Sequence, residues 1–229
     1  MSKVLILLCT LLIISSCRES YDTVEEYEKY IRSEEYPYLK TVVENGVKFQ
    51  LRYMPADAMM ITHYKHFEET KAKISLDSLL TKEVRDQRIN EEVTRIKKTR
   101  DNYENALYFM LTIGYEDESK DLVYSSMQSG FSNYSNWLQK LLFSLNEYIY
   151  LQTPEIEEVP FSIYHMERNY GMMKTRNFLL SFPKEFNDIK ILNSSNEEVK
   201  VVIDDFGFGT GKINFAFNIH DENSMDIKL

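Results

Sequence analysis

The chain has 229 residues and a formal charge of −9 at neutral pH, and 43% of its residues are hydrophobic, including 16 Tyr and 13 Phe. This acidic excess argues against nucleic acid and anionic lipid head groups as partners, because a negative surface is repelled by phosphates. The apolar content is enough for a packed core, and Gly and Pro are scarce, which excludes a disordered or low-complexity chain.

The N-terminal segment has the three parts of a secretory signal. Lys3 is followed by an apolar run from Val4 to Ile14 and then by the small residues Ser15-Ser16. An apolar helix of this length reaches roughly 17 Å, well short of a hydrocarbon core about 30 Å thick. We therefore expect residues 1–16 to be a signal peptide and not a membrane-spanning helix.

The last residues of this segment and the cysteine after them resemble a known sequence motif. Ile14-Ser15-Ser16-Cys17 resembles the lipobox of bacterial lipoproteins, in which a branched apolar residue and two small residues precede a cysteine. The resemblance implies that the Cys17 thiol receives a diacylglyceryl group, and that the lipoprotein signal peptidase then cuts before Cys17. Two or three acyl chains would hold the protein firmly at a membrane. Arg18, in place of the Asp that retains some such proteins, favours the outer over the inner membrane.

The cysteine count agrees with lipid attachment. Of the two cysteines, Cys9 lies in the segment to be removed, so Cys17 would have no second thiol for an internal disulfide. The alternative is an ordinary signal peptide that ends in cysteine. We expect a signal peptide over residues 1–16, a lipidated tether over 17–22 and a single α+β domain over 23–229. Loss of Lys3 with the leader makes the formal charge −10.

The first half of the body is predicted to be mainly helical. Thr23 and Glu26 form a capping box at the start of a helix with Val24, Tyr27 and Ile31 on one face. Asn45-Gly46 marks a turn, and residues 47–53 alternate as a half-buried strand. Pro55 can open the next helix, whose apolar face holds Met60, Tyr64 and Phe67.

Residues 76–100 have the composition of one long charged helix, but their apolar stripe does not keep one phase. One face holds Leu76, Leu79, Leu80 and Val84, and nearly the opposite face holds Ile89, Val93 and Ile96. This change of phase indicates either a break near Arg85–Arg88 or two helix halves that pack on different neighbours, and the break is the preferred interpretation.

Strands are predicted to dominate the second half. Residues 106–115 are expected to form a strand buried on both faces, and a short helix around Trp137-Leu138 is expected to precede a strand over 148–151. Further strands are predicted at 161–166, 177–182, 199–203 and 212–219. Helices in the first half and antiparallel strands in the second predict the α+β class.

The glycine-rich stretch from Asp205 to Lys212 superficially resembles a phosphate-binding loop. Such a loop requires a helix after it and Ser or Thr after the lysine, whereas here Ile213 opens a strand. We interpret the stretch as the turn of a β-hairpin, in which glycines supply positive φ.

Candidate metal ligands occur at His63, His66 and Glu69. Their i, i+3, i+6 spacing spreads them over roughly 120° of helix surface, so a polar helix flank is the preferred interpretation. His165 and His220 could join them only through folding. No metal or cofactor is therefore assigned.

Evidence for catalysis is weak, because the paired carboxylates stand in no context that would separate their pKa values, and the mature body would hold no nucleophilic cysteine. Trp137 and Tyr134 either form an aromatic platform for sugar or peptide or pack in the core. We expect a lipid-anchored envelope protein that binds a protein or glycan without catalysis. The alternatives are an envelope-polymer hydrolase and a periplasmic metal-binding module.

Overall fold

The computed structural model describes residues 21–127, 130–168, 173–193 and 197–219. The helices are α1 (Val24–Arg32), α2 (Ala56–Leu76), α3 (Lys82–Tyr103), α4 (Leu122–Met127) and α5 (Phe131–Phe143), with a 3₁₀ turn at Leu145–Glu147. The first strands are β1 (Leu39–Glu44), β2 (Val47–Met54), β3 (Ala106–Tyr115), β4 (Ile149–Gln152), β5 (Val159–Pro160) and β6 (Ile163–Met166). The others are β7 (Arg176–Pro183), β8 (Glu185–Phe186), β9 (Ile189–Lys190), β10 (Glu198–Ile203) and β11 (Ile213–Asn218).

The strands form antiparallel sheets. A five-stranded sheet has the order β1-β2-β3-β7-β6, a four-stranded sheet has the order β11-β10-β4-β5, and β8 and β9 form a small hairpin. Helices lie mostly toward the N-terminus and strands mostly toward the C-terminus. The predicted α+β class is therefore confirmed.

The main core contains the buried faces of both larger sheets and of α5. Phe109 of β3 packs against Phe217 of β11, with ring centroids 5.2 Å apart, and Leu141 of α5 lies in the same cluster. The prediction that β3 is buried on both faces is wrong for one face. Leu107, Phe109, Leu111 and Ile113 are buried, but the residues between them are only half-buried, because that face of the sheet lacks a complete covering layer.

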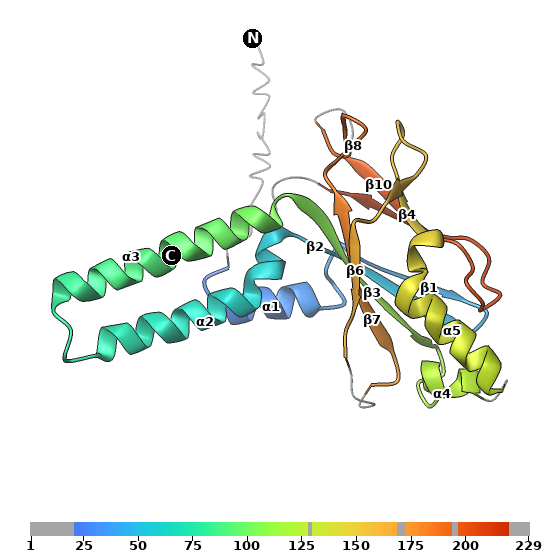
Figure 1. Ribbon diagram of the computed structural model, residues 1–229, viewed down its shortest axis with the longest axis horizontal. Helices are drawn as coiled ribbons and strands as arrows, with labels where there is room; N and C mark the ends of the chain where they lie inside the picture. Colours follow the sequence, from blue (N-terminus) through green and yellow to red (C-terminus); the bar gives the residue numbers. More distant parts are fainter. Residues whose placement is uncertain (1–20, 128–129, 169–172, 194–196, 220–229) are drawn as a thin grey trace, which may run out of the picture.

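The antiparallel helices α2 and α3 form a hairpin that projects away from the sheets (Figure 1). A second cluster of buried side chains lies at the base of this hairpin, and its members are Val24, Tyr27, Ile31, Tyr36, Ala58, Met60, Tyr64, Phe67 and Ile96. Beyond this base the helices have little to pack on. The hairpin is therefore a thin extension of the molecule.

A buried ion pair ties the two helices together at the base. The Asp57 carboxylate is 1% exposed and accepts hydrogen bonds from Arg100 Nε at 2.6 Å and Nη2 at 3.2 Å. The Tyr64 hydroxyl donates to the same carboxylate at 2.8 Å. Burial and the neighbouring Asp57 charge raise the pKa of Tyr64, and the hydrogen bond to Asp57 raises the pKa of Arg100. Both groups therefore keep the proton through which they bind Asp57.

The predicted break near Arg85–Arg88 is wrong in position, because α3 runs unbroken from Lys82 to Tyr103. The chain turns earlier, where the Asp77 carboxylate accepts the Leu79 N–H and the Thr81 hydroxyl caps α3. This turn also explains the change of phase. Leu76 ends α2 and Leu79 and Leu80 lie in the turn, whereas Ile89, Val93 and Ile96 lie on α3.

Most of the other local predictions are confirmed. Thr23 Oγ1 accepts the Glu26 N–H at the start of α1, which is one of the two hydrogen bonds of the predicted capping box. Asn45 and Gly46 both have positive φ in the β1–β2 turn, and Pro55 is the N-cap of α2. The strands predicted at 47–53, 161–166, 177–182, 199–203 and 212–219 correspond to β2, β6, β7, β10 and β11. Among the described residues, none of the helices is both long and apolar enough to cross a membrane.

Candidate functional site

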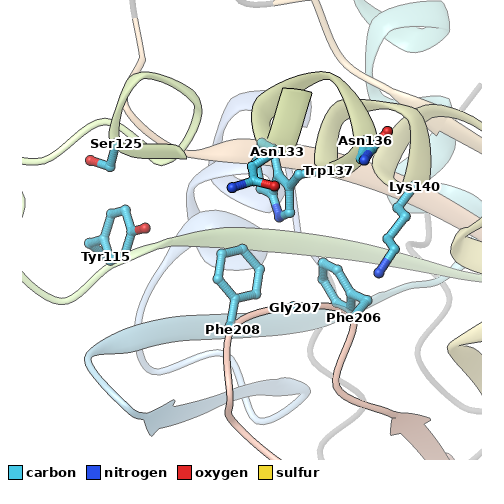
Figure 2. A pocket seen from close by; sticks show the side chains of 9 residues that line it. All are labelled: Tyr115, Ser125, Asn133, Asn136, Trp137, Lys140, Phe206, Gly207 and Phe208. Atoms are coloured by element: carbon cyan, nitrogen blue, oxygen red, sulfur yellow. The ribbon is translucent and has the colours of Figure 1, made fainter. Parts of the chain in front are cut away.

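A cavity of about 400 Å³ lies between the helices α4 and α5 and the loop that joins β10 to β11. It is lined by Tyr115, Ser125, Asn133, Asn136, Trp137, Lys140, Phe206, Gly207 and Phe208. Figure 2 shows the α5 side chains on one wall and the phenylalanines of the loop on the other. The volume is in the range of small-molecule sites in proteins. We take this pocket as the candidate functional site.

The loop wall is shaped by one carboxylate. Asp205 Oδ1 accepts the backbone N–H of Gly207 at 3.1 Å, of Phe208 at 2.8 Å and of Gly209 at 3.1 Å. Gly207 has φ +130° and Gly209 has φ +67°, conformations that L side chains rarely adopt. Burial alone would raise the pKa of Asp205, but these N–H donors together outweigh it and hold the pKa below its ordinary value. The carboxylate thus stays ionised and folds the loop around itself.

A contact from the other sheet holds the tip of the loop. Asn45, in the β1–β2 turn, donates from its side-chain nitrogen to the Phe208 carbonyl at 2.7 Å. The ring of Phe208 packs edge-on against Phe206 at 5.3 Å and against Trp137 at 5.8 Å. The apolar wall of the pocket is therefore fixed by the β1–β2 turn and by α5.

The polar wall comes from one stripe of α5. Asn133, Asn136 and Lys140 have i, i+3, i+7 spacing and so share a face of the helix, while Trp137 and Leu141 point into the core. The Lys140 ammonium lies over the Tyr148 ring, 5.7 Å from its centroid. This wall offers amide donors and acceptors together with one positive charge.

Outside the pocket lining, Lys212 contacts groups on the strands beside the loop. Lys212 Nζ is 2.9 Å from the Tyr150 hydroxyl and 3.2 Å from Asp204 Oδ1. The hydrogen bond with Tyr150, followed by the one with Asp204, raises the pKa of Lys212. Of the adjacent acidic residues Asp204-Asp205, one therefore pairs across the hairpin and the other shapes its turn.

The glycine-rich stretch is confirmed as the turn of a hairpin. It joins β10 and β11, which pair antiparallel from Glu198–Asn218 to Ile203–Ile213. Of the two interpretations of Trp137, core packing is the correct one, since only 9% of the residue is exposed. Trp137 nevertheless borders the pocket. Tyr134 instead packs toward Phe131, with ring centroids 6.3 Å apart.

The candidate metal ligands do not meet. His63 packs against the Tyr103 ring, with centroids 6.2 Å apart, whereas His66 and Glu69 are exposed on α2. His165 is exposed on β6, an edge strand of the five-stranded sheet. Within the described part of the chain, no three His, Cys, Asp or Glu side chains are grouped to hold a metal ion. Cys17 and His220 lie outside the described residues.

The sequence did not single out Asn133, Asn136 and Lys140. Their spacing beside a tryptophan indicates a polar stripe on a helix, but nothing in the sequence pattern shows that the 206–208 loop lies opposite this stripe.

Comparisons with protein-family models, with curated proteins and with solved structures give no match to this chain. The proposed function therefore depends on the geometry of the pocket.

Proposed function

We propose that the protein is a lipid-anchored binding protein of the bacterial envelope, whose pocket takes a hydroxyl-rich ligand such as a segment of an envelope glycan. The observation that carries this proposal is the pocket between α5 and the 206–208 loop. It places amide, hydroxyl and ammonium groups near the half-buried ring of Phe208, whereas the rings of Trp137 and Phe206 are buried beside it. A sugar presents both hydroxyls and an apolar C–H face, and it uses both kinds of wall.

Binding is favoured over catalysis by the kinds of side chain in the pocket. The nine described lining residues are aromatic, amide, hydroxyl, glycine and lysine, with no carboxylate or imidazole among them. Hydrolysis of a glycan bond commonly uses a pair of carboxylates placed on either side of that bond. Asp205 lies beside the pocket, but its oxygens accept the loop N–H groups. The lining residues therefore support a pocket that binds its ligand and releases it without chemical change.

Anchoring is supported by the N-terminal sequence. Val4–Ile14 and Ile14-Ser15-Ser16-Cys17 together have the composition of a lipoprotein leader. Helix α1 begins at Val24, so a lipid at Cys17 would be followed by only a short tether before the folded body. The proposal places the pocket close to a membrane, with the outer membrane favoured by Arg18.

The pocket can be tested with its own fluorophore, because Trp137 is the single tryptophan of the chain and borders the cavity. Soluble peptidoglycan fragments and lipopolysaccharide core oligosaccharides would be titrated into the purified full chain. We expect a saturable change of Trp137 emission with one class of glycan. Asn136→Ala or Lys140→Ala should weaken binding about tenfold, the loss expected for one ligand hydrogen bond.

The matched control is Asn90→Ala, which removes an exposed amide from α3. It should bind as the unaltered chain does. A failure of every glycan to change the emission, or equal affinity for the pocket variants and the control, would refute the proposed ligand.

Anchoring is tested separately by mass spectrometry of the protein from bacterial membranes. The mature chain should begin at Cys17 and carry two or three acyl chains. Cys17→Ser should leave the leader uncut, or give a chain that a high-salt wash removes from the membrane fraction. An unmodified sulfhydryl at Cys17 in the native protein would refute the lipid anchor while leaving the glycan test unaffected.

A further inference from the structure

The end of the α2–α3 hairpin exposes apolar side chains far from either core. Leu76 is 84% exposed and Leu79 is 92% exposed, and Val84 is 37% exposed at the start of α3. Figure 1 shows that the loop carrying Leu79 is the outermost point of the projecting hairpin. Exposed leucines on such a projection are typical of a contact with something outside the chain.

The turn that presents these leucines is built by specific hydrogen bonds. The Asp77 carboxylate accepts the Leu79 N–H at 2.9 Å, and Arg85 Nη1 donates to the Asp77 carbonyl at 3.0 Å. The Thr81 hydroxyl accepts the Val84 N–H. Leu79 is therefore held outward by a shaped turn that ends one helix and starts the next.

The charge of this region differs in sign from that of the molecule. The segment 71–88 holds five cations, Lys71, Lys73, Lys82, Arg85 and Arg88, against three anions, Asp77, Glu83 and Asp86. The whole chain is at −9. Among the described residues, Lys73, Lys82 and Arg88 have no ion-pair partner and are exposed. Residues 76–84 themselves hold one cation and two anions, so the cationic excess lies on the helix turns that flank the tip, with Lys71 and Lys73 on α2 and Arg85 and Arg88 on α3.

From this geometry we propose that the tip of the hairpin, Leu76 to Val84, inserts into the surface of a membrane that contains anionic lipids. Leucines enter the boundary between head groups and acyl chains, and nearby Lys side chains approach the head groups. A protein partner is disfavoured by size, since each side of a stable protein interface buries about 800 Å², far more than two leucines and part of a valine supply. The proposal goes beyond the glycan pocket and does not require a lipid at Cys17.

The test places a tryptophan at the tip. Leu79→Trp in the full chain would be mixed with vesicles of phosphatidylethanolamine and about 30 mol% phosphatidylglycerol whose acyl chains carry bromine, a quencher of tryptophan emission. The matched control is Ile163→Trp on β6, where the native side chain is 69% exposed at a different place in the fold. Trp137 contributes to both samples, so the unaltered chain gives the baseline.

We expect quenching at position 79 to exceed quenching at position 163 by about threefold, and to persist in a Cys17→Ser background. Lys73→Gln with Lys82→Gln should lower the lipid affinity of the tip about thirtyfold. Equal quenching at the two positions would overturn the proposal. So would a shift of the position-79 emission that depends on protein concentration without vesicles, because a second copy would then cover the tip.

Discussion

Asp205 shows how a single side chain can replace the packing that a glycine-rich loop lacks. Gly207 and Gly209 give the chain the freedom to turn, and the carboxylate removes that freedom by accepting their N–H groups. Phe206 and Phe208 alternate with these glycines, so fixing the backbone also fixes the rings. The apolar wall of the pocket therefore depends on an ionised group that is itself outside the cavity lining.

Asp205→Asn removes the charge from this acceptor while keeping its size. We expect the free energy of unfolding to fall by about 1 kcal/mol, because charge-assisted hydrogen bonds become ordinary ones on an exposed loop. Urea denaturation measures this change, and Trp137 emission should shift because Phe208 packs on that ring. Asp86→Asn, on the exposed surface of α3, should leave both unchanged. A loss no greater than that of the control would contradict the role given to Asp205.

The same carboxylate predicts a dependence on pH. Its pKa in the folded chain is lowered, so its contribution to stability is complete above the ordinary aspartate pKa of about 3.9 and is lost as the pH falls through the folded-state value. An NMR titration of the Asp205 carboxyl carbon should give a midpoint below the ordinary aspartate pKa of about 3.9. A midpoint at or above the ordinary value would show that the loop N–H groups do not stabilise the charge.

Among the helices, α2 and α3 are held together at the base of their hairpin by Asp57, whose burial the sequence pattern does not predict. Asp57 sits one turn before the apolar stripe of α2 and gives no sign of being buried, yet Arg100, far along the chain, binds it with two nitrogens. A paired charge in a buried site is stable only with both partners present. The pairing of α2 with α3 therefore depends on this contact as well as on Ile96 and Phe67.

Asp57→Asn should destabilise the chain by about 3 kcal/mol, because Arg100 and Tyr64 lose the anion that compensates their burial. Thermal and urea unfolding of the full chain measure the loss. Asp101→Asn, an exposed change on α3 beside Arg100, is the control and should cost almost nothing. A similar small effect for both variants would show that the hairpin base is held by apolar packing alone.

The sequence predicted these elements well where a local rule acts. The Thr23 cap, the Asn45-Gly46 turn and the alternation of Ile213–Asn218 each depend on neighbours within a few residues. The predicted break near Arg85–Arg88 is misplaced because the turn at residues 77–81 contains neither Gly nor Pro to mark it. The pocket was not predictable as a unit, since Asn45, Trp137 and Phe208 meet only because the two larger sheets and α5 pack around one core.

For the molecule as a whole, stability should be uneven. The sheets share one buried cluster, the hairpin base has another, and residues 71–90 of the hairpin have no fully buried side chain. Helical propensity and side-chain pairs alone give only marginal stability to a helix in water. The tip region can therefore open without disturbing the sheets.

Hydrogen exchange should resolve this difference. Backbone amides within residues 71–90 should exchange at least about 100-fold faster than those of β3 and β7, because opening the tip exposes little apolar surface. The amides of α1, a short helix whose buried face packs on the hairpin base, serve as a helical control and should be intermediate. Equal protection along the whole of α2 and α3 would show that the hairpin unfolds only with the sheets.

The position of β3 has a consequence for the order in which a nascent chain can fold. One edge of β3 pairs with β2, which is synthesised earlier, but the other pairs with β7, which follows only after α4, α5 and β4–β6. Until residues 176–183 arrive, an aromatic and aliphatic strand presents unpaired backbone groups, a template for aggregation. A translation product that stops before Arg176 would carry this open edge permanently, so late completion of the five-stranded sheet is the vulnerable stage in making this protein.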